Sequence, residues 1–384
     1  MRKWSGVTSL AVGIFVLITI EELPIGVLPV MSAELGIPEG VAGLAVTVPG
    51  LVAAATSVTT PVLVRGLDRR LVLVLALLCV AASSLLTVLA PGFGVVLVAR
   101  VLAGVSIGLY WAVLPIVAVG QVDPARHATA LTLAFSGTGG ALVLGVPLAT
   151  WIGTHLGWRE AFAVVGAAAL VMALLVAVLV RPVRAAVPVT PAMMREAARE
   201  RGVRHAVGLT LLLIVAQFAT YSYVSPLLQE AGVPLGRTGL LLLLFGIAGM
   251  IGNVAIAPVI RRRGAPTAVL VVAAGLTLSL LAVAVLLRTP VAAVLLLPTW
   301  GLFAGAASVT IQSFVDSEAG ARVEEGTALD SAAFNVSIAL GAALGGILLE
   351  TAGRTGMLAV SVLLGAAGTA LVARYRARPG PRTA

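Results

Sequence analysis

Long apolar runs dominate this chain and restrict how it can fold. A helix needs about 20 apolar residues in succession to cross roughly 30 Å of hydrocarbon. Twelve runs of about that length stand between polar or Pro/Gly punctuation, near residues 7–30, 40–64, 71–90, 93–119, 127–152, 158–180, 205–229, 235–260, 266–287, 290–315, 325–350 and 354–375. Only 11% of the 384 residues are charged, whereas soluble domains carry about 25%. The sequence therefore predicts an all-α membrane protein with 12 transmembrane helices.

The rare residue types exclude several classes of protein. Lys3 is the only lysine, which excludes a P-loop and the ATP-driven pumps that depend on one. Cys79 is the only cysteine, and His127, His155 and His205 are far apart, so we expect no disulfide and no metal cluster. The net charge of +9 does not indicate nucleic acid, because the arginines lie in loops between apolar runs. We expect no cofactor, and no catalytic residues of an enzyme.

The longest polar interval, residues 181–204, divides the runs into six and six. We therefore predict an N-terminal six-helix bundle over residues 1–180, a linker over 181–204, and a C-terminal six-helix bundle with a short tail over 205–384. The halves repeat short patterns at matching positions, such as Leu144-Gly145 in the fifth run and Leu340-Gly341 in the eleventh. Internal repeats are common in transporters, so we expect the two bundles to be pseudo-symmetric.

The basic residues predict how the chain is oriented. Twenty of the 25 Lys and Arg residues lie in the loops of one side, and Arg100 lies inside a run. The other side has only four, Arg159, Arg237, Arg288 and Arg354. Basic loops stay in the cytoplasm, so the linker and both termini are expected to be cytoplasmic.

Five short motifs, in order along the chain, resemble those of the major facilitator superfamily. They are Glu21–Pro29, Ala99–Gly104, Gly145–Pro147, Leu244–Gly249 and Ala333–Asn335. Their order and spacing resemble those of the motifs in one branch of the 12-span drug:proton antiporters. This branch contains arabinose, purine-nucleoside and chloramphenicol exporters. The resemblance implies the major facilitator fold, alternating access, and a pathway surrounded by spans 1, 4, 7 and 10. We expect a monomer in the bacterial cytoplasmic membrane, with protons and a small molecule as its partners besides lipid.

Charged groups inside the hydrocarbon are costly and usually mark a function. Glu21 lies nine residues, about 13 Å, from the outer end of span 1, and Arg100 lies seven residues, about 10 Å, from the outer end of span 4. Because these depths nearly match, we expect Arg100 to pair with Glu21 or Glu22 and one of these acids to exchange a proton for substrate. The alternative is that Arg100 and a glutamate only tie spans 1 and 4 together.

Neutral polar side chains in the four pathway spans are candidate substrate contacts, as the resemblance implies. Roles in packing or at the lipid surface stay open for each of them. The candidates are Tyr110, Trp111, Gln217, Tyr221, Tyr223 and Gln312.

A third group of residues is expected to act on conformation rather than chemistry. Gly145 and Pro147 should shape a close helix contact and a bend in span 5. Asp330 stands where the family commonly has Asn, near the start of span 11, where a carboxylate suits a helix N-terminus. It is also an extra acid that would alter coupling. The full set is Asp68, Arg69, Gly145, Pro147, Asp330 and Asn335.

Together, these observations predict a secondary transporter that exports a drug, sugar, nucleoside or metabolite in exchange for protons. A uniporter or a proton-linked importer on the same fold is the alternative. A membrane sensor that binds ligand without transport is a rival of another class.

Overall fold

The computed structural model describes residues 2–64, 67–183, 195–320 and 322–377, and over these residues the chain forms helices and no strand. The chain divides into two compact units. The first contains Met1–Pro188 and Pro234–Leu243, and the second contains Val189–Val233 and Leu244–Ala384.

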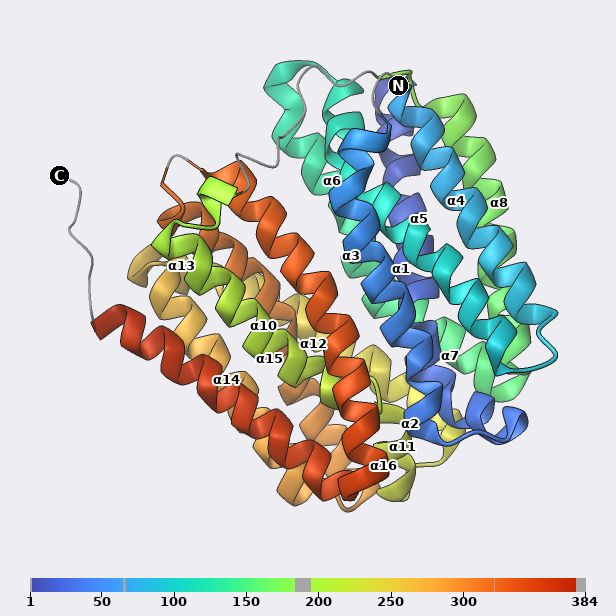
Figure 1. Ribbon diagram of the computed structural model, residues 1–384, viewed down its shortest axis with the longest axis vertical. Coiled ribbons are helices and arrows are strands. Elements are labelled where there is room, and N and C mark those ends of the chain that lie inside the picture. The colour runs from blue at the N-terminus through green and yellow to red at the C-terminus, as the bar shows by residue number, and fades with distance from the viewer. Residues whose placement is uncertain (1, 65–66, 184–194, 321, 378–384) are drawn as a thin grey trace. The chain divides into compact units, whose positions relative to one another are not determined.

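The first unit is built around one central helix (Figure 1). In the most apolar 18-residue stretch of α1, 89% of the residues are buried, and in that of α5 61% are buried. α1 packs against α5, α6, α7 and α8, and α4 packs against α5 and α8. The elements are α1 (Arg2–Leu35), α2 (Glu39–Ala42), α3 (Leu44–Leu63), α4 (Arg69–Val88), α5 (Phe93–Gly120), η1 (Pro124–Arg126), α6 (His127–Gly140), η2 (Ala141–Gly145), α7 (Val146–His155) and α8 (Trp158–Leu179).

In the second unit, α10 packs most extensively against α16, and α14 packs against α15 and α16. The elements that follow the linker are α10 (Arg201–Tyr221), α11 (Val224–Glu230), η3 (Leu235–Arg237), α12 (Thr238–Ala255), α13 (Ala257–Arg263), α14 (Ala265–Leu286), α15 (Pro290–Glu318) and α16 (Val323–Ala377). Of these, η3 and the start of α12 belong to the first unit.

Eleven helical stretches of the described residues are long and apolar enough to cross a membrane, and the last of them provides two crossings. That stretch, Glu325–Ala377, has 53 residues, which as one straight helix would measure about 80 Å. Gly353 interrupts it with φ 64° and ψ −175°, a conformation outside any helix. The break separates the two segments predicted at 325–350 and 354–375, so the fold contains twelve crossings.

Prolines account for two interruptions of the predicted spans, of which the one near Pro147 was expected as a bend. The span predicted near 205–229 is interrupted, because α10 ends at Tyr221 and α11 begins at Val224. Pro226 lacks the N–H that would bond the Ser222 carbonyl. The second interruption lies in the crossing formed by α6 and α7, which contains the π-helical turn η2 just before Pro147. Turns of this kind relieve the lost bond and bend the helix.

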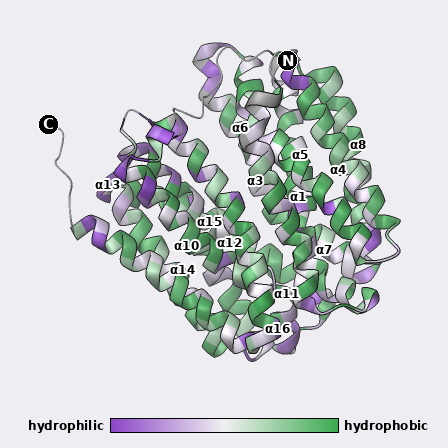
Figure 2. Cartoon of the chain, in the orientation of Figure 1, coloured by the Kyte–Doolittle hydropathy of each residue, from purple (hydrophilic) through white to green (hydrophobic). Residues whose placement is uncertain are grey.

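Apolar side chains cover the outside of the helices as well as their interior. Val178 on α8 and Val254 on α12 are 71% and 74% exposed. Figure 2 shows hydrophobic residues along the helices and hydrophilic residues gathered near helix ends and loops. In water such a surface would drive association, whereas lipid solvates it, as a multi-pass membrane protein requires.

Candidate functional site

Arg100 is fully buried in the first unit and binds two backbone carbonyls on other helices. Its Nε donates to the Ala45 carbonyl of α3 at 3.0 Å, and its Nη2 donates to the Ile20 carbonyl of α1 at 3.0 Å. Its guanidinium also lies 5.8 Å from the centre of the Phe162 ring on α8. One side chain of α5 therefore joins three neighbouring helices.

The two carbonyls that Arg100 binds are those that prolines leave without a helical donor. In an α-helix a carbonyl accepts from the N–H four residues later. Four residues after Ile20 is Pro24, and four residues after Ala45 is Pro49, and proline has no N–H. Arg100 thus supplies donors that α1 and α3 lack, in a setting without water to replace them.

The two acids of α1 are both buried, with 6% of each exposed. Arg100 lies close enough to Glu21 for their charges to attract. Within the described chain no direct ion pair joins Arg100 to Glu21 or Glu22, and Nη1 of Arg100 is buried without a hydrogen-bond partner. The guanidinium therefore has one donor group left over beside Glu21.

Glu22 lies on a different face of α1 from Glu21, since consecutive helical residues point about 100° apart. Thr19 packs against Gly145 of η2, and Gly26 packs against Thr150 of α7. Glu22 stands between Thr19 and Gly26 on this face, which places it toward η2 and α7. Its Oε2 is buried without a hydrogen-bond partner.

Three of the residues predicted to contact substrate have hydrogen-bond partners within their own units. The Tyr110 hydroxyl donates to the Leu10 carbonyl at 3.0 Å and lies against Gly13 in the first unit. In the second unit, the Tyr223 hydroxyl donates to the Ala342 carbonyl at 2.8 Å. Gln312 donates to Asp316 at 2.8 Å and to Thr327 at 2.9 Å. A fourth, Trp111, packs against Phe135 with ring centres 5.7 Å apart.

Gln217 and Tyr221, the remaining two, belong to an aromatic cluster with Phe245 and Trp300. The Trp300 Nε1 donates to Gln217 Oε1 at 2.7 Å. Tyr221 stacks on Phe245 at 4.9 Å, and Trp300 lies edge-on to Phe245 at 5.3 Å. The sequence analysis did not select Phe245 or Trp300, because an aromatic residue in an apolar run reads as packing. Their position near Gln217 depends on how α10, α12 and α15 cross.

The candidate conformational residues fall in separate places. Gly145 lies against Thr19 of α1, and Pro147 is the second residue of α7, which follows η2. Asn335 donates to the Ser331 carbonyl of its own helix at 2.9 Å. The Asp330 Oδ1 accepts from the Thr210 hydroxyl of α10 at 2.6 Å, so this carboxylate binds a neighbouring helix.

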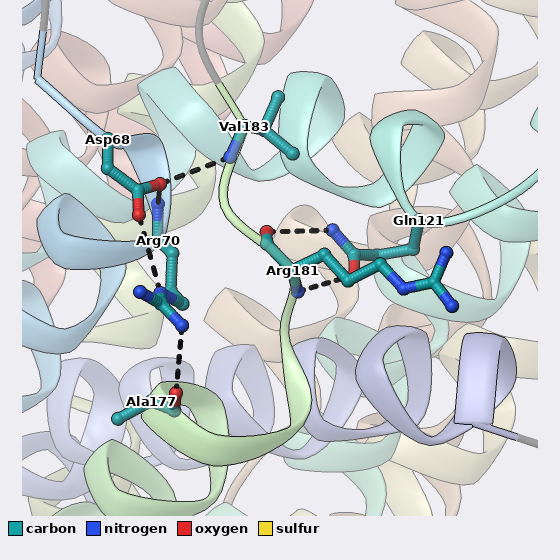
Figure 3. A network of polar contacts seen from close by, with 6 residues as sticks. All are labelled: Asp68, Arg70, Gln121, Ala177, Arg181 and Val183. Carbon is teal, nitrogen blue, oxygen red and sulfur yellow. Dashed lines mark hydrogen bonds and ion pairs between the residues drawn. The ribbon is translucent and has the colours of Figure 1, made fainter.

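Asp68 and Arg69 hold the start of α4 to the chain that follows α8, and Figure 3 shows the contacts of Asp68. Asp68 caps α4 by accepting from the Arg70 N–H at 3.0 Å, and it also accepts from the Val183 N–H at 3.1 Å. The Arg69 N–H donates to the Val183 carbonyl at 2.9 Å, and its side chain donates to the Val64 carbonyl. All these partners belong to the first unit.

Gln121 strengthens the same connection from the end of α5. Its amide donates to the Arg181 carbonyl at 3.3 Å and accepts from the Arg181 N–H at 2.8 Å (Figure 3). In the part of the chain that the structure describes, no group of three or more His, Cys, Asp or Glu side chains is arranged to hold a metal ion.

Comparison with known proteins agrees with this architecture. Residues 10–324 match the family model of the Major Facilitator Superfamily, and the chain belongs to that family. It is therefore a multi-pass membrane transporter of the major facilitator fold.

Among similar proteins, the transcription regulatory protein OpdE of Pseudomonas aeruginosa is 32% identical over 98% of this chain and 96% of its own length. The purine ribonucleoside efflux pump NepI of Escherichia coli K12 is 29% identical over 94% of this chain and 91% of its own length.

Two solved structures share the fold. A bacterial homolog of the human lysosomal transporter Spinster has a TM-score of 0.71 at 15% identity and covers 99% of both chains. The human organic anion transporter MFSD10 (TETRAN) has a TM-score of 0.69 at 18% identity, covering 97% of this chain and 99% of its own.

Proposed function

We propose that this transporter exports a small organic molecule in exchange for protons. The observation that carries the proposal is the buried Glu21 beside Arg100, whose Nη1 has no other partner. An ionised side chain at the centre of a membrane helix costs at least about 2.5–3.5 kcal/mol, so one that is retained there marks a functional site by default. Glu21 is the proton carrier, and Arg100 sets its environment.

The chemistry requires only that Glu21 alternate between two states. A protonated Glu21 is neutral and leaves Arg100 bound to its two carbonyls alone. A deprotonated Glu21 attracts the free Nη1 and gives a charged pair across α1 and α5. Each proton that moves inward through the membrane contributes about 2.3 kcal/mol per 100 mV, enough to drive export against a gradient.

Glu22 is a second candidate proton site in the same helix. Its like charge repels that of Glu21, which opposes ionisation of both acids at once. Its face toward η2 and α7 gives it an environment without Arg100.

The substrate class follows from two kinds of support. Relatives of this chain are named purine ribonucleoside efflux pumps. In addition, the Gln217, Tyr221, Phe245 and Trp300 cluster combines aromatic faces with an amide, the features that suit a planar base or an aromatic drug. We therefore place nucleosides first, ahead of drugs, sugars and other metabolites.

The location and assembly follow from the same reasoning. The protein is proposed to act as a monomer in the bacterial cytoplasmic membrane, with the linker and both termini in the cytoplasm. The excess of arginine on one side of the chain supports this orientation.

The test uses purified protein in liposomes that contain a pH-sensitive dye. Nucleosides, sugars and amphipathic antibiotics are added in turn under an imposed proton gradient. We expect substrate-dependent proton flux with one class in the wild type and in the control Glu160→Gln, which changes an exposed acid at the start of α8. Glu21→Gln should abolish that flux.

Two other functions would appear as different results. The protein is a uniporter if labelled substrate moves down its gradient without a proton response, at equal rates in the wild type and in Glu21→Gln. Substrate and protons moving in the same direction indicate an importer. The name of OpdE, a transcription regulatory protein, favours a sensor as the second candidate, and ligand binding without any flux would support it.

A further inference from the structure

Asp330 is a buried acid of the second unit that the proposed exchange at Glu21 does not use. Only 7% of it is exposed, and its Oδ1 accepts from the fully buried Thr210 hydroxyl at 2.6 Å. Thr210 lies nine residues into α10 and Asp330 seven residues into α16, about 13 and 10 Å from the helix starts. The pair thus lies within the helical bundle and not at a helix terminus.

No cation neutralises this carboxylate in the described part of the chain, where no ion pair involves Asp330. The elements packed against α16, the helix that carries Asp330, are α10, α14 and α15, and α14 has no charged residue. The ionisable groups toward this end of the unit include Arg201, Arg204 and His205 on α10, Asp316 and Glu318 on α15, Arg322 just before α16, and Glu325, Arg374, Tyr375 and Arg376 on α16.

Several of these groups are engaged elsewhere. Arg201 and His205 lie against the Tyr375 ring, at 5.2 and 4.7 Å. Glu318 accepts from the Tyr375 hydroxyl, and Asp316 accepts from Gln312.

Arg204 lines a cavity whose walls include chain neighbours of Asp330 and Thr210. This cavity measures about 200 Å³ and is bounded by Ala198, Val203, Arg204, Val207 and Leu329, so it has room for several water molecules. Leu329 directly precedes Asp330, and Val207 is one turn before Thr210. Arg204 is exposed, which indicates that the cavity opens to water at the end of the unit where α10 begins.

We propose that Asp330 and Thr210 form a proton-binding site of the second unit, separate from Glu21, which exchanges protons with water through this cavity. On protonation an O–H bond forms at the carboxylate as a hydronium ion in the cavity gives up a proton and becomes water. Hard metal cations take about six or more oxygen ligands, and one carboxylate with one hydroxyl supplies too few. A proton is the ion that this pair can bind.

Proton binding here would act on the main helix contact of the second unit. A hydrogen bond to an ionised carboxylate is about twice as strong as one between neutral groups. Protonation of Asp330 therefore weakens the Thr210 bond between α10 and α16. The site would link proton occupancy to the packing of these two helices.

The test detects the proton directly and needs no substrate. Infrared difference spectra of the purified protein, recorded as the pH is lowered, should show a carboxylic-acid C=O band. The band should remain in Glu21→Gln, shift in frequency in Thr210→Val because the hydroxyl donor is lost, and disappear in Asp330→Asn. Asp330→Glu, which keeps a carboxyl group, serves if the Asn variant fails to fold and should retain a shifted band.

A band that persists unchanged in Asp330→Asn, or in both Thr210→Val and Asp330→Glu, overturns the proposal. Failure of the proposed export function gives a different result. In that case substrate-dependent proton flux is absent while the Asp330 band remains.

Discussion

At the scale of residues, Arg100 combines a structural task with an electrostatic one. Its Nε and Nη2 satisfy the Ala45 and Ile20 carbonyls that Pro49 and Pro24 leave free, and its Nη1 stays unpaired beside Glu21. The prolines therefore determine where the guanidinium is held. This arrangement fixes the charge next to the acid without neutralising it through a direct ion pair.

The link between Arg100 and Pro24 predicts a non-additive effect on stability. Arg100→Ala should destabilise the protein by about 3–5 kcal/mol, the usual cost of removing one partner from a buried charged cluster. Pro24→Ala returns a helical donor to the Ile20 carbonyl. It should therefore stabilise the Arg100→Ala variant by about 1 kcal/mol more than it stabilises the wild type.

Thermal unfolding of the four proteins in detergent measures this coupling. Additive shifts in the unfolding temperature would show that Arg100 does not replace the missing N–H.

Part of the Arg100 site could be predicted from the sequence. The matching depths of Arg100 and Glu21 in their spans predicted that these residues are neighbours, because the depth of a residue follows from counting along the helix. The carbonyl acceptors were missed, since backbone contacts between helices depend on crossing geometry. The proline four residues after each acceptor was the signal available in the sequence. For Phe245 and Trp300, no comparable pattern in the sequence indicated their position beside Gln217.

At the scale of elements, glycines determine how closely α1 packs on the crossing formed by α6, η2 and α7. A Cβ at Gly137 would overlap the Ala11 carbonyl of α1, and one at Gly145 would overlap the Thr19 hydroxyl. The glycines within Gly137–Gly140 differ from one another in this respect. Gly139 has open space at the Cβ position.

This difference supplies a matched pair of variants within α6. Gly137→Ala should destabilise the protein by about 1–3 kcal/mol, because overpacking forces the helices apart. Gly139→Ala should be neutral or stabilising by up to about 1 kcal/mol, since alanine favours helix. Thermal unfolding compares the two, and equal effects would contradict the close approach of α1 and α6.

The number of crossings and the bend near Pro147 were predictable, and the break between Tyr221 and Val224 was not. Runs of about 20 apolar residues follow from the thickness of a membrane, so the twelve crossings could be read from the sequence. Whether a proline bends a helix, widens it as at η2 or ends it as at Tyr221 depends on which neighbours satisfy the freed carbonyl.

At the scale of the whole molecule, each unit carries its own buried acid site, Glu21 with Arg100 in the first and Asp330 with Thr210 in the second. An exchanger needs proton access from both sides of the membrane, so the orientation of the chain matters. The arginine asymmetry predicts that loops such as that at Asp123 are cytoplasmic and that the loop at Pro91 faces outward.

Cysteine labelling tests this orientation, because the chain has a single native cysteine. In a Cys79→Ser background, Pro91→Cys should react with a membrane-impermeant maleimide in intact cells. Asp123→Cys should react only after the cells are made permeable. Both positions are exposed, and the reverse pattern would invert the proposed topology.

If Glu21 carries the transported proton, its replacement by glutamine should separate proton coupling from substrate movement. Liposomes containing wild type or Glu21→Gln receive labelled substrate either under an imposed gradient with an acidic interior, or under counterflow without one. We expect Glu21→Gln to lose uphill accumulation but to keep counterflow, since substrate binding and alternation between the two conformations survive without the proton. Uphill accumulation by Glu21→Gln at the wild-type level would contradict this expectation.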